Sequence, residues 1–579
     1  MKRLLGYLKP FRLRITIGLS VKFIGTIMDL FLPWILSYII DTVIPTKRIN
    51  SIIFWGCMMI VCSVCALTFN IVANRMASFV SSRCTRAIRH DLYAKISYLD
   101  AKQLDRFTVS SLESRLTSDT YNIHKMIGML QRLGIRAPIF LIGGITITFL
   151  LDVKLTLVLV CTMPFIALTI IIISKKGIRL FTLLQQAIDN MTCVIRENAA
   201  GVRVIKALRR GEYEKRRFDK SNINAIKKEK AVGITMALTN PLITLFLNIG
   251  LCAVIAVGAY LVNNGQSTNG KIIAFISYFT IISNAMISIS RMFAIVSKGS
   301  AGMGRIDKVL SCKPTLWVRE PESEENSSEP ISFDKPHIEF KNVTFAYNDV
   351  NIIENISFSL LHGQTLGIIG PTGSGKSTLI SLLNRTYDVG RGEILIDGRN
   401  IKRIPTKKLS EKFGFVFQND FFFADTIREN INFGRDLSDE EISLALKRAQ
   451  ASEFVNAYYD GILHRLDIKG ANISGGQKQR LLIARALAAN PEILVLDDSS
   501  SALDFKTDAA LRAEISRSMK DTTTIIITQR ISSIMNADLI LVLSGGRISG
   551  MGKHSELLES CPEYREISES QMGGCFALE

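Results

Sequence analysis

The chain has 579 residues, of which 47% are hydrophobic and 21% charged, and its formal net charge is +18. This length is too great for one hydrophobic core and predicts two or more domains. The basic residues cluster between apolar runs without a stacking pattern of aromatic residues, which favours a membrane surface and argues against nucleic acid as the partner. The ten cysteines show neither metal-type clustering nor a disulfide framework.

The N-terminal half contains six apolar stretches that are long enough to cross a bilayer, which takes roughly 20 residues. They lie near 15–40, 52–74, 137–151 (extended on its N-terminal side), 155–174, 232–262 and 271–293. The third and fourth are separated only by Leu151–Lys154 and should form a tight hairpin. The first follows Met1-Lys2-Arg3 without a small-residue cleavage site, which predicts a retained span and not a signal peptide.

Basic residues predict the orientation of these spans. They are concentrated before the first span and in the long loops 75–136 and 175–231, whereas the other connections are short and weakly charged. Because basic loops stay in the cytoplasm, both termini and both long loops are predicted to be cytoplasmic, and a bacterial plasma (inner) membrane is the default location. The loops should be helical extensions of the spans, with turns near 104–108 and 210–214. Each tip would dock on a cytoplasmic domain or would simply be a solvated charged face.

Few ionisable residues lie within the spans. Lys22 and Asp29 share one helix face, and a charge in lipid needs a cavity or a partner. One hypothesis is that Asp29 faces a central cavity and, with polar residues such as Asn240 and Asn284, sets substrate preference. The alternative is a structural pair, or a Lys22 that snorkels to the membrane interface. The generally apolar spans suit amphipathic drugs, lipids or peptides equally, so the cargo stays open.

The acidic, proline-flanked stretch from 311 to 336 is typical of an exposed linker. It separates a predicted membrane domain, 1–310, from a predicted soluble domain, 337–579.

A glycine-rich loop dominates the soluble domain. It connects an apolar strand at 365–369 to a helix that continues through 379–383, and it consists of Gly370, Pro371, Thr372, Gly373, Ser374, Gly375, Lys376, Ser377 and Thr378. Such a loop curls backbone N–H groups around phosphate oxygens, next to the positive end of a helix dipole. Lys376 would reach the β- and γ-phosphates and Ser377 would bind Mg²⁺. The alternative is a glycine-rich turn that binds nothing.

Further candidate residues follow predicted strands. Tyr347 ends an alternating strand and would stack on an adenine ring, and Gln418 ends the strand 413–418. Ser474, Gly475, Gly476 and Gln477 begin a helix and form a second phosphate-binding surface. A buried strand at 493–496 ends in Asp497 and Asp498, which places a carboxylate beside the phosphate loop as a Mg²⁺ partner.

This ordered set of motifs resembles the nucleotide-binding domain of ABC transporters, and the six spans ahead of it resemble a type I (type IV) exporter half-transporter. The implied fold is an α-helical six-span transmembrane domain fused to an α/β P-loop ABC nucleotide-binding domain. The implied cofactors are ATP and Mg²⁺, the latter held by Ser377, Gln418 and Asp497. The resemblance also implies a dimer in which the signature Ser474–Gln477 contacts the ATP of the other subunit. Ser501 and Asp504 would form the D-loop between the sites.

Two positions depart from the family pattern. Asp498 stands where hydrolysing members have a glutamate that positions water, and Gln529 stands where they have a histidine. The resemblance therefore implies that this chain binds MgATP and hydrolyses it weakly, while its signature completes a competent site on a different half-transporter. Alternatives are a homodimer with two slow sites, an importer with an exporter fold, and a non-transporting regulator gated by ATP. The six spans exclude a soluble ATPase.

Overall fold

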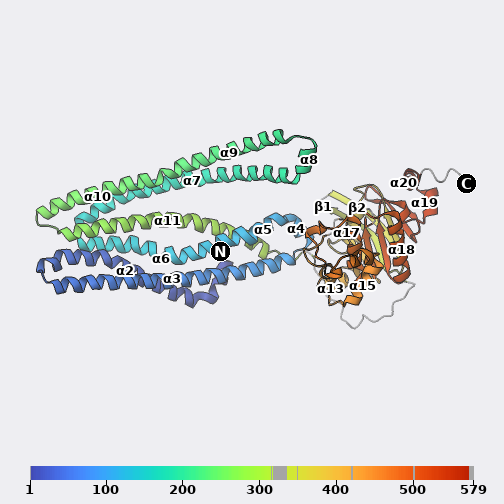
Figure 1. Ribbon diagram of the computed structural model, residues 1–579, viewed down its shortest axis with the longest axis horizontal. Coiled ribbons are helices and arrows are strands. Elements are labelled where there is room, and N and C mark those ends of the chain that lie inside the picture. Colours follow the sequence, from blue (N-terminus) through green and yellow to red (C-terminus); the bar gives the residue numbers. More distant parts are fainter. Residues whose placement is uncertain are drawn as a thin grey trace. The chain divides into compact units, whose positions relative to one another are not determined.

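The computed structural model describes residues 2–314, 316, 335–347, 350–418, 421–499 and 502–572. The chain forms two compact units, one made of residues 1–98 and 107–312, the other of 99–106 and 313–579 (Figure 1). The short segment 99–106 therefore belongs to the second unit although it lies within the membrane half of the sequence. Most of the expected linker 311–336 lies outside the described residues.

The first unit is entirely helical, and most of its helices are longer than a membrane span. Its elements are α1 (Lys2–Leu8), η1 (Lys9–Phe11), α2 (Arg12–Tyr38), η2 (Ile39–Val43), η3 (Ile44–Thr46), α3 (Ile49–Ser97), α5 (Val109–Ser114), η4 (Arg115–Asp119), α6 (Thr120–Leu151), α7 (Val153–Ala200), α8 (Val202–Ala207), α9 (Gly211–Ala237), α10 (Thr239–Asn263) and α11 (Asn269–Leu310). Among the described residues, six helical segments are long and apolar enough to cross a membrane. The six predicted spans are thus confirmed, and the long loops are helical continuations of them.

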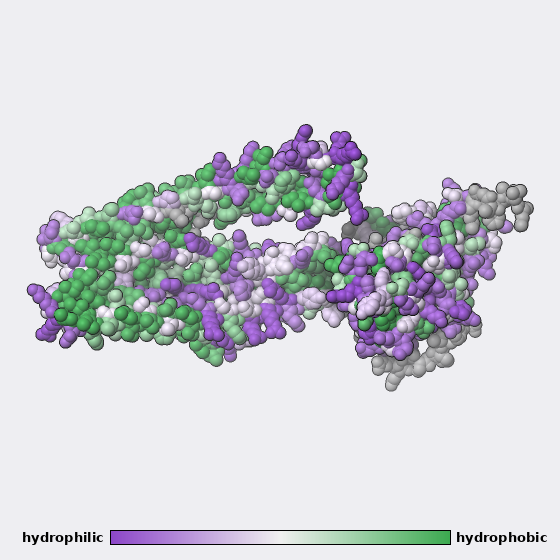
Figure 2. All heavy atoms as spheres, in the orientation of Figure 1, coloured by the Kyte–Doolittle hydropathy of each residue, from purple (hydrophilic) through white to green (hydrophobic). Residues whose placement is uncertain are grey.

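Hydropathy changes along these helices. Hydrophobic residues gather over the end that holds α10 and the connection between α2 and α3, whereas hydrophilic residues gather toward α8 and α9 (Figure 2). Large apolar side chains such as Phe54 and Phe149 are exposed on the spans. An exposed apolar surface of this kind suits contact with lipid tails.

The predicted hairpin between the third and fourth spans is confirmed, because Asp152 alone separates α6 from α7. The Asp152 carboxylate accepts hydrogen bonds from the backbone N–H of Lys154 (2.9 Å) and of Leu155 (3.3 Å). It thereby caps the start of α7 and satisfies N–H groups that have no partner within the helix.

Long-range hydrogen bonds hold α11 to the rest of the bundle. The buried Tyr278 hydroxyl donates to the backbone oxygen of Leu30 in α2 (2.6 Å). The Asp41 carboxylate accepts from the Gly270 N–H (2.7 Å) at the start of α11, and Arg305 Nε donates to the buried Asp119 (2.8 Å) near its other end. These contacts hold α11 near both of its ends.

The second unit is built around two sheets. Its strands are β1 (Ile338–Tyr347), β2 (Val350–Leu360), β3 (Thr365–Ile369), β4 (Arg391–Ile396), β5 (Arg399–Asn400), β6 (Phe413–Val416), β7 (Ile493–Asp497), β8 (Thr523–Ile527), β9 (Leu539–Ser544) and β10 (Arg547–Gly552). One sheet has the order β2-β1-β4-β5 and is antiparallel, and the other has the order β10-β9-β3-β8-β7-β6. In the second sheet β3, β6, β7, β8 and β9 run parallel, so their carboxyl ends meet at one edge.

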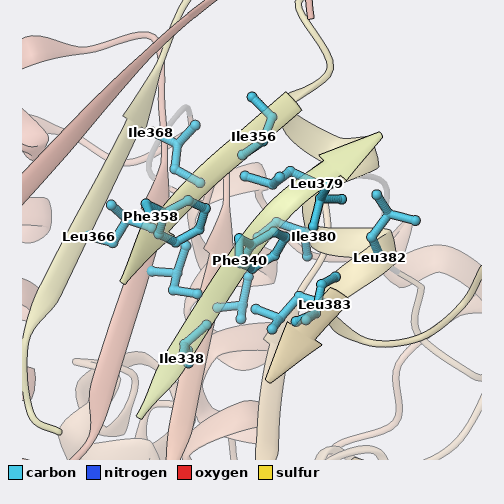
Figure 3. Packing of buried hydrophobic residues seen from close by; sticks show 14 of the residues in the cluster. Ile338, Phe340, Ile356, Phe358, Leu366, Ile368, Leu379, Ile380, Leu382 and Leu383 are labelled. Atoms are coloured by element: carbon cyan, nitrogen blue, oxygen red, sulfur yellow. The ribbon is translucent and has the colours of Figure 1, made fainter. Parts of the chain in front are cut away.

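Helices surround the two sheets. They are α4 (Ala101–Phe107), α12 (Lys376–Leu383), α13 (Thr406–Glu411), α14 (Ile427–Asn432), α15 (Asp439–Arg448), α16 (Ser452–Asn456), η6 (Gly461–Leu463), η7 (Ile468–Gly470), α17 (Gly475–Leu487), α18 (Phe505–Ser518), η8 (Ile531–Ser533), α19 (His554–Ser560) and α20 (Pro562–Met572). The main core lies where β1 and β2 pack against β3 and α12 (Figure 3). Alternate residues of β1 point into it, as a half-buried strand requires.

We expect Phe340→Ala to destabilise the second unit by about 3–5 kcal/mol, because it removes a buried ring that stacks on Phe358 with the ring centroids 4.5 Å apart. Tyr459→Ala is the control, since Tyr459 is fully exposed and its loss should change stability by less than about 0.5 kcal/mol. Thermal unfolding of the purified chain in detergent checks both. Equal melting temperatures for the two variants would contradict this description of the core.

Candidate nucleotide-binding site

The phosphate loop occupies residues 370–375, between the carboxyl end of β3 and the start of α12. Gly370 has φ +152°, and a Cβ at this position would lie 2.1 Å from the backbone oxygen of Leu543. Gly375 has φ +97° and lies against the backbone of Ile352. Other residues would be strained or would clash at these two positions. The loop geometry therefore depends on glycine, as the sequence predicts.

Lys376 curls back over this loop. Its Nζ donates hydrogen bonds to the backbone oxygens of Gly370 and Pro371, both at 2.8 Å. Burial lowers the pKa of Lys376, and the nearby carboxylates of Asp497 and Asp498 oppose that shift. The ammonium thus lies at the mouth of a loop whose N–H groups suit phosphate oxygens.

A cavity of about 360 Å³ opens beside the loop. Its lining comes from the carboxyl edge of the parallel sheet, from β1 and β2 and from the start of α12, and consists of Tyr347, Ile352, Thr372, Gly373, Gly375, Lys376, Ser377, Thr378, Gln418, Asp497, Asp498, Ile527, Thr528 and Gln529. Most of the predicted ATP-binding residues are brought together here. Gly370, Pro371 and Ser374 are not in the lining, and they form the loop beneath it.

Oxygen ligands meet on one side of the cavity. The Ser377 hydroxyl lies near the carboxylate of Asp497 at the end of β7, and burial raises the pKa of that carboxylate. Gln418 lines the same cavity and lies near Asp498. A hydroxyl, a carboxylate and an amide oxygen are the hard donors that Mg²⁺ prefers. The residues present therefore fit a magnesium ion, which Ser377, Gln418 and Asp497 would hold.

Asp498 has a left-handed backbone conformation with φ +49°. Its N–H donates to the backbone oxygen of Ile527 (2.9 Å), which ties the end of β7 to β8. Burial raises the pKa of its carboxyl group, whereas Arg530 and Gln418 oppose that shift. Asp498 therefore lines the cavity, and its hydrogen bond to Ile527 holds its backbone in place.

Gln479 is a residue that the sequence reasoning missed. Its Nε2 donates to the backbone oxygen of Asp498 (3.1 Å), and its Oε1 accepts from the N–H of Ala502 (3.1 Å). One side chain of α17 thus links the carboxyl end of β7 to the segment that follows. Its position in the sequence could have identified Gln479, because it lies two residues after Gln477 on the same predicted helix.

Tyr347 ends β1 at the mouth of the cavity. Its hydroxyl lies near Thr378, and burial raises its pKa. Its ring lies edge-on to Tyr387, with the ring centroids 5.2 Å apart. This position is consistent with the predicted contact with a nucleobase.

The predicted signature lies at the start of α17. Ser474 caps the helix, and its hydroxyl accepts from the N–H of Gln477 while the Gln477 side chain accepts from the N–H of Ser474. None of the residues from Ser474 to Gln477 lines the cavity described above. Asp504 caps α18 through the Thr507 N–H (2.6 Å), and Ser501 lies outside the described residues.

Docking was predicted for both loop tips, and the tip of the first long loop does lie within the second unit. Asp105 in α4 accepts a hydrogen bond from the Tyr387 hydroxyl (2.8 Å). Gln103, in the same helix, donates to the backbone oxygen of Lys313 (2.5 Å). Burial and the Asp105 carboxylate both raise the pKa of Tyr387. Because Tyr387 also lies beside Tyr347, α4 is two side chains away from the cavity.

The residues proposed for a substrate cavity have different surroundings. Asp29 accepts hydrogen bonds from Arg136 (3.2 Å) and from Asn70 (3.3 Å). Lys22 donates to the same Asn70 (2.8 Å), so Lys22 and Asp29 are linked through that amide and not directly. Asn284 is exposed on α11, and the side chain of Asn240 lies outside the described residues. The role of these residues in substrate preference stays a prediction.

Comparison with known proteins gives two family matches. Residues 15–286 match the ABC transporter transmembrane region, and residues 353–501 match the ABC transporter family. The ABC transporter ATP-binding protein YfiB of Bacillus subtilis is 35% identical over 578 residues, covering 99% of both chains. An ABC transporter ATP-binding protein of Mycobacterium tuberculosis is 32% identical over 571 residues, covering 98% of this chain and 97% of its own.

A solved structure shares the fold over nearly the whole chain. The bacterial Atm1-family ABC exporter with ATP bound has a TM-score of 0.80 and 24% identity, covering 97% of this chain and 98% of its own. The fold of this chain is therefore one that is already known.

We expect Lys376→Met to weaken ATP binding by about 10-fold or more, because it removes a charge-assisted contact with the phosphates. Fluorescence titration of the purified chain with a trinitrophenyl derivative of ATP measures this affinity. Lys506→Met is the control, since Lys506 is exposed on α18. Unchanged binding in Lys376→Met would mean that the loop does not hold the phosphates.

Proposed function

Because the chain belongs to the ABC transporters, we propose that it is one half of an ATP-driven exporter and that the other half is a different chain. It is a multi-pass integral membrane protein with an ATP-binding domain, and this family couples ATP hydrolysis to transport. The proposal rests mainly on one observation. Asp498 and Gln529 both line the cavity of the phosphate loop, at the positions where hydrolysing members carry glutamate and histidine.

The first consequence is a weakly hydrolytic site. Hydrolysis requires a water molecule held in line with the γ-phosphate. The side chain of Asp498 is one methylene shorter than glutamate and is engaged by Gln418, so it reaches less far toward such a water. The neutral amide of Gln529 has no titratable proton to share with the phosphate. Ser377, Gln418 and Asp497 still supply ligands for Mg²⁺, so MgATP binding should persist.

The second consequence is a partner that carries the competent site. The signature Ser474–Gln477 retains its glycines and its helix cap but does not line the cavity of its own chain. Its backbone N–H groups suit a phosphate presented by another subunit. A partner half-transporter would carry glutamate and histidine at the positions of Asp498 and Gln529. Together with this signature, it would form a complete hydrolytic site. Two sites of unequal activity would then lie between the two subunits.

The third consequence concerns how nucleotide binding reaches the membrane. The Asp105–Tyr387 hydrogen bond ties α4 to the side of the nucleotide cavity. The other loop tip, α8, exposes Val204 (60%) and Leu208 (66%) between basic residues, and we place this tip on the partner's nucleotide domain. Closure of the two domains around ATP would then move the helices that continue into the spans. ATP must bind the closed dimer more tightly than the open one.

The basic loops favour a cytoplasmic location for the ATP sites, and the likeness to a bacterial exporter supports export from a bacterial plasma membrane. The cargo would be a small amphipathic molecule, a lipid or a peptide. Asp29, Asn240 and Asn284 are the candidates for contacting it. Asp29 is already bound by Arg136 and Asn70. It would therefore affect substrate preference by positioning these two side chains, and not by offering an unpaired charge to the cargo.

ATPase measurements test the division of labour. We expect little hydrolysis by the purified chain alone and robust hydrolysis once it is co-expressed with the partner half-transporter. The double change Asp498→Glu with Gln529→His should raise the activity of the chain alone by about 100-fold, the usual contribution of a positioned general base.

Three outcomes would overturn parts of this proposal. Robust ATPase activity of the unmodified chain alone would show that Asp498 is competent and would favour a homodimer. If the pair keeps its ATPase activity after the partner's glutamate is replaced, the two ATP sites are not unequal in the way proposed. Nucleotide-dependent uptake into inverted vesicles would indicate export, nucleotide-dependent release of preloaded cargo would indicate import, and the absence of both in an active pair would indicate a regulator.

We expect Tyr387→Phe to lower vesicle uptake several-fold without changing ATP affinity, because it removes the hydrogen bond to Asp105 and costs about 1 kcal/mol at the α4 contact. Asp105→Asn should have a similar effect, and the double variant should be no worse than either single one. Tyr459→Phe is the matched control on the exposed surface. Additive losses in the double variant would contradict a direct coupling of these two residues.

A further inference from the structure

A cluster of two histidines and an aspartate lies in the second unit, away from the nucleotide cavity. His337 immediately precedes β1, His362 lies in the connection from β2 to β3, and Asp397 lies in the turn from β4 to β5. His362 is just ahead of β3, and His337 contacts Thr523, the first residue of β8. The cluster is therefore at the amino edge of the parallel strands, whereas the phosphate loop is at their carboxyl edge.

The three side chains lie close to one another. His362 Nε2 lies 3.0 Å from Asp397 Oδ1, and His337 Nε2 lies 3.7 Å from the same oxygen. The two imidazole rings are stacked, with centroids 3.8 Å apart and planes inclined by 10°. One donor atom from each residue lies within 4.8 Å of the others.

His337 carries an unsatisfied polar atom. Its side chain is fully buried, and its Nε2 has no hydrogen-bond partner. Its Nδ1 lies 2.7 Å from the Thr523 hydroxyl oxygen. If Nδ1 carries the proton, the Nε2 lone pair faces the Asp397 carboxylate. If Nε2 carries it, that N–H has no acceptor within hydrogen-bond distance. If Nδ1 carries the proton, it donates to the Thr523 hydroxyl, and a cation bound to Nε2 would give that nitrogen the partner it lacks.

We propose that His337, His362 and Asp397 bind a divalent cation of the zinc class. Two imidazole nitrogens and a carboxylate oxygen are a donor set typical of Zn²⁺. Ligands about 2.0–2.1 Å from a tetrahedral metal are about 3.3 Å apart, and the 3.0 and 3.7 Å separations bracket this value. The Asp397 side chain is 33% exposed, so a water molecule can supply the fourth ligand and the ion has a route in.

The surrounding charges support this assignment. Lys412 binds the other carboxylate oxygen of Asp397, Oδ2 (3.2 Å), and also pairs with Glu492. Oδ1 is thereby left facing the imidazoles, and Glu492 balances the lysine charge. Such a hydrogen-bonded outer shell is usual around metal ligands.

A metal here would connect the two sheets. His337 and Asp397 belong to the antiparallel sheet, and His362 precedes the central strand of the parallel one. A bound ion would therefore stabilise the second unit from the edge opposite the nucleotide. This assignment concerns a site separate from the one that carries the proposed function, and it does not depend on a heterodimer.

Co²⁺ is the probe for the test, because tetrahedral Co²⁺ with nitrogen and oxygen ligands absorbs in the visible range. The full-length chain in detergent, free of nucleotide and chelator, is titrated with Co²⁺ and then with Zn²⁺ as a competitor. We expect one equivalent to bind with visible bands and without the near-ultraviolet thiolate band that cysteine ligation produces, and we expect Zn²⁺ to displace it. Zn²⁺ should also raise the melting temperature.

Two ligand variants and one control make the test specific. His362→Gln and Asp397→Asn should each weaken Co²⁺ binding by at least about 10-fold and abolish the Zn²⁺-dependent rise in melting temperature. In the control His464→Gln, binding should be unchanged. His464 likewise stacks on an aromatic ring, Tyr458, and lies 3.0 Å from a carboxylate, Asp460, but it has no second histidine at that carboxylate in the described chain.

The proposal is overturned if the unmodified chain binds no Co²⁺, if both ligand variants bind as tightly as the unmodified chain, or if a thiolate band shows that cysteines hold the ion. Because ATP affinity is measured on the same samples, a ligand variant that has merely unfolded is recognised by its loss of ATP binding. The conservative variant His337→Gln then replaces it, and its unchanged metal affinity would also overturn the site.

Discussion

The parallel arrangement of β3, β6, β7 and β8 is the constraint on which the soluble unit depends. Parallel strands bring residues that are far apart in sequence to a common edge, and ligands of open α/β sheets bind beyond the carboxyl ends. Gln418, Asp497 and Gln529 each follow a different strand and meet the phosphate loop there. The same geometry gathers His362 and Thr523 at the opposite edge. One topological rule thus produces both the nucleotide cavity and the histidine cluster.

Helix α4 shows how the two parts of the chain are interwoven. It lies between two long membrane helices in the sequence, yet it packs with the soluble unit through Asp105 and Gln103. Polar contacts of this kind are individually weak, about 1 kcal/mol each.

Charges within the membrane helices follow a different logic. Lys22, Asp29 and Arg136 are joined through Asn70 into one network, because an isolated charge in a lipid environment is costly. Asn70 can serve both signs at once, since its amide oxygen accepts from Lys22 and its amide nitrogen donates to Asp29. The structure thus shows a structural partner for Asp29, and its contact with substrate stays a prediction.

Local patterns in the sequence determined the six spans, the phosphate loop, the helix caps at Ser474 and Asp152 and the strand that ends in Asp497, because each depends on residues close together in the chain. They also located Asp498 and Gln529 within the motifs. Tertiary structure alone decided that Gln479 bridges Asp498 to Ala502, that Asp29 pairs with Arg136 and that α4 joins the soluble unit. His337, His362 and Asp397 carry no recognisable spacing, and only the pairing of β1 with β4 brings His337 and Asp397 together. The physical reason is that hydropathy and turn chemistry act over a few residues, whereas side-chain contacts across a sheet depend on strand order and register.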